Sequence, residues 1–163
     1  MEKERLKFCI GRFDDYYNSI NNKSAVFLGL STFIVGGLVS AYPAIIKLVT
    51  CGFFIHALLL SLIGLGVANM IIVIGASTPF LSRGVESLHY FGAISCLKHD
   101  VYCNKSSGCC TEEDELRDLR TQVHQLAIGL SGKFGKMRVA GILFTIQFVL
   151  FIPLIIIIVC NIK

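Results

Sequence analysis

The densest group of Cys and His residues, whose types could hold a metal ion, lies in one short segment. Its members are Cys96, His99, Cys103, Cys109 and Cys110. Zinc takes four nitrogen or sulfur ligands, but the paired C-x2-4-C knuckle of structural zinc sites is missing here. Asn104, Ser106, Ser107 and Gly108 have the composition of a loop tip. We therefore expect a polar loop with reduced thiols and no bound metal.

No group of residues has the spacing of a catalytic motif. The chain contains neither G-x-S-x-G nor H-E-x-x-H, and no Ser, His and Asp stand in an arrangement above chance. His89 and His124 are single histidines within expected helices, where a structural or solvent-facing role is more common than that of a base. The sequence thus predicts a protein that is not an enzyme and has no cofactor.

The composition excludes an ordinary soluble domain. The chain has 163 residues, of which 54% are hydrophobic and 16% charged, whereas soluble domains average about 25% charged residues. Its mean hydropathy is +0.70, far too apolar for a disordered chain. The basic residues are interspersed with acidic ones rather than gathered in a stripe, so we expect no nucleic-acid partner.

The apolar residues form three long runs, at Ser24–Ile46, Gly52–Ala76 and Val139–Cys160. A bilayer core of about 30 Å needs roughly 20 apolar residues in a helix. We therefore predict an all-α membrane protein with three transmembrane helices. The connection Lys47–Cys51 is very short, so the first two helices should form a hairpin, with the third helix separate and longer.

The distribution of Lys and Arg predicts the topology. Residues 1–23 and 77–138 hold all but two of them, and the other side of the membrane holds only Lys47 and Lys163. By the positive-inside rule, the N-terminus is cytoplasmic. The expected organisation is an N-terminal cytoplasmic amphipathic helix (1–23), a transmembrane hairpin (24–76), a cytoplasmic helical region (77–137) and a third transmembrane helix (138–160).

Helical periodicity extends into the cytoplasmic parts. Residues 2–22 carry one apolar stripe, a second helix is expected at Ser82–Leu97, and Thr111 is a good N-cap for a third. This third helix has no breaker before the last span, so a continuous helix from Glu112 to Cys160 is expected. Its seam of apolar residues needs a partner helix, either from the same chain or from another copy, and we expect a homo-oligomer. The seam consists of Leu116, Leu119, Val123, Leu126, Leu130, Phe134 and Met137.

Small and polar residues interrupt the long apolar helices at several points. Gly129, Gly132 and Gly135 share one helix face near the membrane boundary. They favour either a close helix–helix approach or a hinge, while a phosphate cradle is a weak third reading. Within the spans, Asn69 and His56 are expected to face the bundle interior, where they either line a pore or bond across helices.

A series of short motifs carries a family resemblance by its order and spacing. The motifs are Phe13-Asp14-Asp15-Tyr16-Tyr17, Asn22-Lys23-Ser24-Ala25, Thr78-Pro79-Phe80, Leu88-His89-Tyr90-Phe91-Gly92-Ala93-Ile94, Asp118-Leu119, Gln122-Val123-His124 and Lys133-Phe134. With these motifs the chain resembles, over nearly its whole length, the transmembrane effectors of Pycsar, the bacterial pyrimidine-cyclase antiphage system.

The resemblance implies an effector in the cell inner membrane. It would sense a cyclic pyrimidine mononucleotide, cUMP or cCMP, that a partner cyclase makes on infection, and would then disrupt the membrane and stop growth. Such a ligand would be bound by cations at its phosphate, by aromatic side chains against its base and by amides that form hydrogen bonds. On this resemblance the candidate ligand-binding residues are Tyr17, Asn21, Lys23, Tyr90, Arg117, Arg120, Gln122, Lys133 and Lys136, and the candidate hinge is formed by Gly129, Gly132 and Gly135.

Three alternatives share the same sequence features. A SLATT-type effector of another nucleotide-signalling system would have the same hairpin and toxicity but a different ligand. An autonomous small channel or transporter would need no nucleotide, and its polar intramembrane residues would control the flux. A scaffold would assemble through the seam Leu116–Met137.

Overall fold

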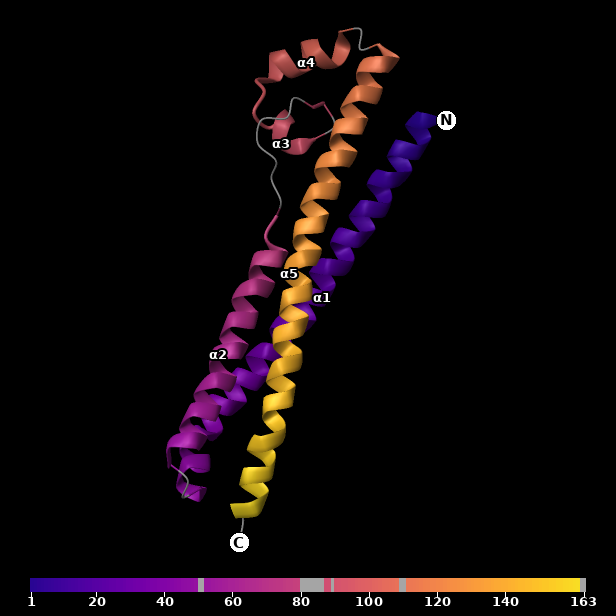
Figure 1. Cartoon of the computed structure of the whole chain (residues 1–163). Coiled ribbons are helices and arrows are strands. Elements are labelled where there is room, and N and C mark those ends of the chain that lie inside the picture. Colours follow the sequence, from indigo (N-terminus) through magenta and orange to yellow (C-terminus); the bar gives the residue numbers. More distant parts are fainter. Residues whose placement is uncertain (50–51, 80–86, 89, 109–110, 162–163) are drawn as a thin grey trace. The chain divides into compact units, whose positions relative to one another are not determined.

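The computed structural model describes residues 1–49, 52–79, 87–88, 90–108 and 111–161, and these contain helices and no strand. The helices are α1 (Glu2–Leu48), α2 (Gly52–Ser77), α3 (Phe91–Ile94), α4 (His99–Ser107) and α5 (Glu112–Asn161), as shown in Figure 1. The expected all-α fold is confirmed.

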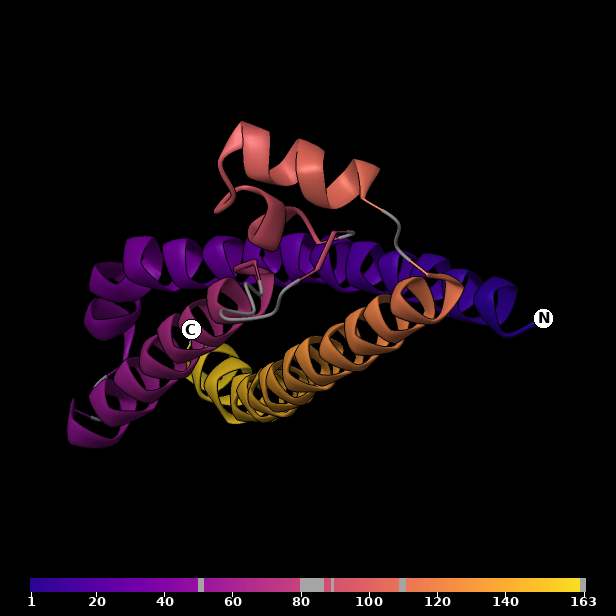
Figure 2. The ribbon, with the colours of Figure 1, turned by 90° about the horizontal axis from the view of Figure 1, so that it is seen from above.

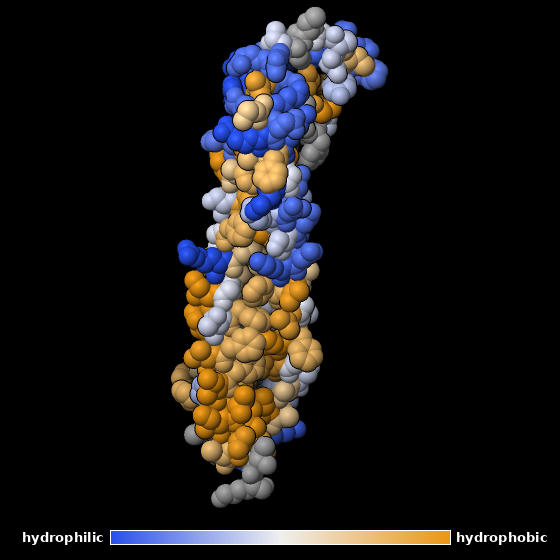
Figure 3. Space-filling model, turned by 90° about the vertical axis from the view of Figure 1, so that its right-hand side faces the viewer, coloured by the Kyte–Doolittle hydropathy of each residue, from blue (hydrophilic) through white to orange (hydrophobic). Residues whose placement is uncertain are grey.

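Three of these helices, α1, α2 and α5, are long and apolar enough to cross a membrane. They contain the apolar runs expected from the sequence, and the short connection between α1 and α2 makes the expected hairpin. The protein is therefore a membrane protein with three candidate spans. In Figure 3 the hydrophobic surface is continuous over the apolar parts of these helices and gives way to hydrophilic groups elsewhere.

The chain divides into two compact units, which we describe separately. The polar unit comprises Met1–Ser19 and Pro79–Gly132, and the membrane unit comprises Ile20–Thr78 and Lys133–Lys163. All acidic residues of the sequence fall in the polar unit. The membrane unit has only cations as charged residues, which are Lys23, Lys47, Lys133, Lys136, Arg138 and Lys163.

The membrane unit is a bundle of three helix segments that contact one another in every pairing. Ser31 of α1 accepts a hydrogen bond from Asn69 of α2, Gln147 of α5 donates to the Leu62 carbonyl of α2, and Ser24 Oγ lies 3.2 Å from Met137 Sδ. Seen from above, the three segments surround a common interior instead of lying in one plane (Figure 2).

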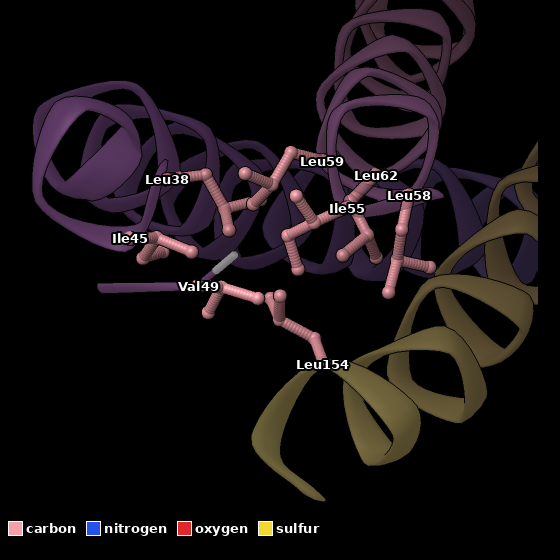
Figure 4. Close-up of a cluster of buried hydrophobic side chains, with 8 residues drawn as sticks. All are labelled: Leu38, Ile45, Val49, Ile55, Leu58, Leu59, Leu62 and Leu154. Carbon is pink, nitrogen blue, oxygen red and sulfur yellow. The ribbon is translucent and has the colours of Figure 1, made fainter. Parts of the chain in front are cut away.

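An apolar cluster fills one half of this interior. Its buried members are Leu38, Ile45, Val49, Ile55, Leu58, Leu59, Leu62 and Leu154. Figure 4 shows them pointing toward one another from α1, from Val49 just after its end, from α2 and, through Leu154, from α5. The contributions of α2 recur at helical spacing, so one face of that helix is buried along its length.

In the polar unit, the start of α1 is bound to the start of α5 by ion pairs. Arg120 holds both carboxylate oxygens of Glu2, at 2.9 and 3.0 Å, and also pairs with Glu113 at 2.9 Å. Lys3 pairs with Glu115. Leu6 and Leu119 are buried in the same unit. In this unit α1 of the same chain thus lies against part of the apolar seam of α5, where Leu119 is buried, while Leu116, Val123 and Leu126 stay partly exposed.

Two expectations for the segment between the spans are wrong. The helix expected at Ser82–Leu97 is reduced, among the described residues, to the single turn of α3; residues 80–86 and 89 lie outside the described residues. The polar loop expected around Asn104 and Gly108 is instead the nine-residue helix α4. Asp100 in its first turn and Lys105 in its last turn complement the helix dipole, which offsets the low helix propensity of Asn and Ser.

The helix α5 is continuous, as expected, and Thr111 caps it. Thr111 Oγ1 accepts from the Asp114 backbone N–H at 3.3 Å, while Asp114 Oδ2 accepts from the Thr111 hydroxyl at 2.6 Å and from the Thr111 N–H at 3.2 Å. These reciprocal bonds form a capping box. The bonds from Thr111 hold the pKa of Asp114 below its usual value.

We expect Thr111→Ala to destabilise the first turn of α5 by about 1 kcal/mol, the usual cost of losing a Thr cap. Amide hydrogen exchange of the polar unit in detergent would measure the change. The control is Thr121→Ala, because the Thr121 hydroxyl donates to the Arg117 carbonyl within the helix and caps nothing. Equal protection in the parent and Thr111→Ala proteins would contradict the assignment of the cap.

Candidate functional site

The residues that we predicted to bind a ligand are divided between the two units. Tyr17, Tyr90, Arg117, Arg120 and Gln122 belong to the polar unit. Asn21, Lys23, Lys133 and Lys136 belong to the membrane unit. We therefore examine the two sets separately, starting from the cations, because an anionic ligand depends on them most.

The two lysines of α5 bind the end of α2. Lys133 Nζ donates to the Ala76 carbonyl at 2.7 Å and Lys136 Nζ donates to the Gly75 carbonyl at 2.8 Å. The last carbonyls of a helix have no partner within the helix and carry the negative end of its dipole. The lysines thus serve as a C-cap for α2 within the membrane unit, and Lys133 is 6% exposed.

The remaining members of the membrane-unit set are exposed. Asn21 and Lys23 both point away from the packed faces of α1, since their neighbours Ile20 and Ser24 are the buried residues of that turn. The structure therefore places these two residues on the surface of the membrane unit and not in a pocket.

Of the two candidate cations in the polar unit, Arg120 is held in ion pairs with Glu2 and Glu113, whereas Arg117 is exposed. The ion pairs of Arg120 with Glu2 and Glu113 raise the pKa of Arg120 and, through Arg120, lower the pKa of Glu2. A ligand phosphate would have to displace these carboxylates from Arg120. Arg117 is exposed on α5, and among the described residues no carboxylate forms an ion pair with it that a phosphate would have to displace.

Two buried acceptor oxygens, from Asp118 and Gln122, lie on one face of α5 in the polar unit. Asp118 Oδ2 accepts from the Leu88 backbone N–H at 2.9 Å, but Asp118 Oδ1 is buried without a hydrogen-bond partner among the described residues. Gln122 Oε1 is likewise buried and has no hydrogen-bond partner among the described residues. The two residues are four positions apart, so they share one face of the helix. Such oxygens are costly unless a donor reaches them.

The segment that precedes α3 packs against this face through Leu88. Leu88 is the first residue of the motif Leu88–Ile94. Ser87 is buried, and its hydroxyl accepts from the Tyr90 backbone N–H at 3.1 Å. The Tyr90 ring lies over Gly92, where an added Cβ would come within 2.6 Å of the ring carbon Cε1. Gly92 thus permits the Tyr90 ring to lie close to the backbone. His89 lies outside the described residues.

Tyr17 ties α1 to α5 within the polar unit. Its hydroxyl donates to the Leu126 carbonyl at 3.0 Å, and burial, followed by the charge of Asp14, raises its pKa. The hydrogen bond engages the hydroxyl, so a ligand would meet the ring of Tyr17 and not its oxygen.

The glycines expected to form a hinge do not break α5, which passes through all three as a regular helix. Gly129 is buried, whereas a Cβ added at Gly132 or Gly135 would meet nothing within 4 Å. Gly132 and Gly135 are therefore not sites of close helix–helix approach in this structure. The division between the two units falls between Gly132 and Lys133.

Among the described residues, no three His, Cys, Asp or Glu side chains come together as a metal site. Cys103 Sγ lies 3.6 Å from His99 Nε2, because the two residues are one turn apart on α4. Cys96 is a free thiol. Cys109 and Cys110 lie outside the described residues.

Sequence reasoning selected Gln122 for its amide but missed Asp118 and Ser87 as members of the same site. The signal was present, since Asp118 and Gln122 are four apart on a helix and directly precede the seam residues Leu119 and Val123, so their face adjoins the apolar seam. What the sequence could not show was that the segment at Ser87–Leu88, thirty residues earlier in the chain, binds Asp118.

Comparison with known proteins gave one match. A protein-family model described as "Pycsar effector protein domain" matches residues 5–160. No match was found among the curated proteins or among the solved structures.

Proposed function

The chain belongs to the Pycsar effector protein domain family, and from this premise we propose how it acts as an antiphage membrane effector. It senses cUMP or cCMP, made by a partner pyrimidine cyclase, through its polar unit on the cytoplasmic side. Binding then leads to disruption of the cell inner membrane and abortive infection. The proposal includes self-association of copies in the membrane.

The observation that carries the nucleotide proposal is a pair of buried oxygens, Asp118 Oδ1 and Gln122 Oε1, that have no hydrogen-bond partner among the described residues. Both are acceptors, so they suit hydrogen-bond donors. Uracil offers its N3–H, cytosine its exocyclic amine and the ribose its 2′-hydroxyl. A ligand that supplied two such donors would relieve the cost of burying these oxygens, which is about 1–3 kcal/mol for each neutral group.

The other parts of a cyclic nucleotide find matching chemistry close by. The Tyr90 ring belongs to the turn that packs on the Asp118 face and offers a surface for base stacking. The cyclic phosphate carries one negative charge, for which the exposed Arg117 is a suitable cation. Arg120 could follow if the phosphate displaced Glu2.

Transmission to the membrane would use α5, which contains both the ligand-facing residues and the last apolar run. A ligand shifts a closed–open equilibrium only by its differential affinity for the two states. The segment Gly129–Gly135 has low helix propensity and contains the division between the units, so we place the bending or sliding step there.

The test of recognition is a thermal-shift screen of the purified protein against cyclic nucleotides. A ligand that binds only the folded state stabilises it by about 2.7 kcal/mol at a hundredfold excess over Kd. We expect cUMP or cCMP to raise the Tm, and we expect Gln122→Leu to abolish the rise. Gln125→Leu is the matched control, since Gln125 has the same side chain on the same helix and none of its atoms is a buried, unpartnered oxygen.

A rise in Tm that is equal in Gln122→Leu and Gln125→Leu would remove the Asp118–Gln122 face from the proposal while leaving nucleotide sensing in place. A purine cyclic nucleotide that stabilises the protein better than either pyrimidine would favour the SLATT-type alternative.

The proposed orientation of the chain in the membrane leads to a separate prediction. A reporter fused after Lys163 should be active on the exterior of the inner membrane, and one inserted at Ser107 should be active in the cytoplasm, because Lys and Arg are concentrated in residues 1–23 and 77–138. Paired alkaline phosphatase and fluorescent-protein fusions would measure both sites. Finding both reporters on one side would contradict three spans.

A further inference from the structure

The interior of the membrane unit has buried polar side chains among apolar ones in one half and an apolar cluster in the other. Ser24, Ser31, Asn69 and Gln147 are each at most 1% exposed and come from all three helices. Beyond them, on the side of the α1–α2 connection, lies the apolar cluster shown in Figure 4, and the Tyr42 hydroxyl of α1 forms a hydrogen bond with His56 Nδ1 of α2 at 2.8 Å beside it. The polar half begins where Lys133 and Lys136 cap α2.

Asn69 leaves one polar atom without a partner. Its amide Nδ2 donates to Ser31 Oγ at 2.9 Å, while its Oδ1 is buried and accepts no hydrogen bond from the described residues. Asn69 and Ser31 are both 0% exposed, so lipid headgroups and bulk water do not reach this oxygen in the packed state.

Gln147 repeats the pattern further along the interior. Its Nε2 donates to the Leu62 carbonyl at 3.0 Å, and its Oε1 is buried without a partner among the described residues. Gly66 makes room for this amide, since a Cβ there would lie 2.9 Å from Gln147 Nε2. The site is therefore shaped around a polar group that the packed bundle satisfies only in part.

Unpartnered acceptors are more costly inside a bilayer than in a soluble core, because no water is available to them. Water would satisfy both oxygens if the three helices separated along this face. The lipid-facing surface offers no such row of amides, since Leu60, Ile71 and Phe148 there are apolar and more than half exposed. The interior of the unit is thus the surface suited to water.

We propose that the interior of the membrane unit is a gated path for water and small ions. The layer of Ser31, Asn69 and Gln147 becomes hydrated when the helices separate, and the apolar cluster around Leu59 closes the path at rest. Apolar constrictions stop conduction by excluding water, so no charged gate is needed. The messenger as trigger rests on the proposed function, but the path and its gate do not.

The decisive variant places a hydroxyl inside the gate. Leu59 is 0% exposed and Leu60 is 59% exposed, so Leu59→Ser wets the gate whereas Leu60→Ser makes the same chemical change on the lipid face. Each purified protein is reconstituted in liposomes loaded with K⁺ and the dye calcein, with no nucleotide added. We expect Leu59→Ser to leak K⁺ and retain calcein, and we expect Leu60→Ser and the parent protein to retain both.

A second variant tests the polar layer without weakening the packing. Asn69→Leu combined with Gln147→Met removes both unpartnered oxygens at similar side-chain volume. The change also removes the amide donors to Ser31 and Leu62, but it leaves no polar side chain at these two positions for water to bind when the helices separate. We therefore expect K⁺ flux through the Leu59→Ser background to fall about tenfold. Circular dichroism and detergent sizing would confirm that each variant is folded.

Three results would overturn the path. Equal leakage from Leu59→Ser and Leu60→Ser would show that position does not matter. Release of calcein together with K⁺ would show general disruption of the bilayer. Undiminished flux after removal of both amides would exclude the polar layer. None of these readouts uses a nucleotide, so a parent protein that binds no cyclic nucleotide contradicts the proposed function alone.

Discussion

Cells that express the Gly132→Ala, Gly135→Ala double variant together with a pyrimidine cyclase are expected to keep their membrane potential, whereas cells with the parent protein and the same cyclase are expected to depolarise. Each substitution restores about 1 kcal/mol of helix propensity. Neither added Cβ meets an atom within 4 Å, so packing is unchanged. The variant should still bind the messenger, because Asp118 and Gln122 are untouched.

The matched control for this experiment is Gly141→Ala. Gly141 lies in the same helix, and its added Cβ also meets nothing within 4 Å. It brings the same gain in helix propensity per substitution, about 1 kcal/mol, beyond the segment assigned to bending, so it should leave depolarisation intact. A potential-sensitive dye measures all three strains. Depolarisation by the double variant at the parent level would contradict a hinge at Gly132 and Gly135.

The second large effect is expected from Lys133→Met. This change removes the donor to the Ala76 carbonyl while preserving most of the aliphatic stem. The carbonyl is left without its cap in a site where the lysine is 6% exposed. We expect a loss of about 1–3 kcal/mol in the unfolding free energy of the membrane unit, seen as a lower Tm in detergent.

Lys136→Met serves as the control for that change. Its amine caps the neighbouring Gly75 carbonyl, but Lys136 is exposed, so water can replace the lost donor. Its effect should therefore be clearly smaller. Equal losses of stability for the two variants would show that burial of Lys133 contributes nothing to the cap.

The spans and the long last helix could be predicted because they depend on composition alone. Runs such as Gly52–Ala76 exceed the thickness of a bilayer core, and the N-cap residue Thr111 followed by acidic residues marks where α5 begins. Such signals are local and strong. Asn69 was correctly expected to face the bundle interior for a similar reason, since an amide facing lipid is unfavourable.

The partners of individual charged residues could not be predicted in this way. Arg120, Lys133 and Lys136 were selected as ligand cations for their charge, but tertiary packing gives each of them a protein partner. Those partners lie in distant parts of the sequence, as Glu2 and Ala76 show. The helix α4 is hard to predict because Asn and Ser are common in loops and have low helix propensity. The favourable interactions of Asp100 and Lys105 with the helix dipole oppose that tendency.

The candidate site could be predicted from the sequence only in part. Gln122 and Tyr90 could be selected from the sequence by residue type, and the structure places Tyr90 in the turn that packs on the α5 face carrying Gln122. Asp118 emerged only from the structure, through its bond to Leu88 and its unpartnered oxygen. Unsatisfied hydrogen-bonding capacity is a property of packing, so no sequence pattern displays it.

The most direct test of the central claim uses the purified parent protein in liposomes that hold a K⁺ diffusion potential. Addition of cUMP or cCMP on the side of the polar unit should collapse the potential, while a cyclic purine nucleotide at the same concentration should not. A potential that persists with every cyclic nucleotide, or that collapses before any is added, would contradict a messenger-gated membrane effector.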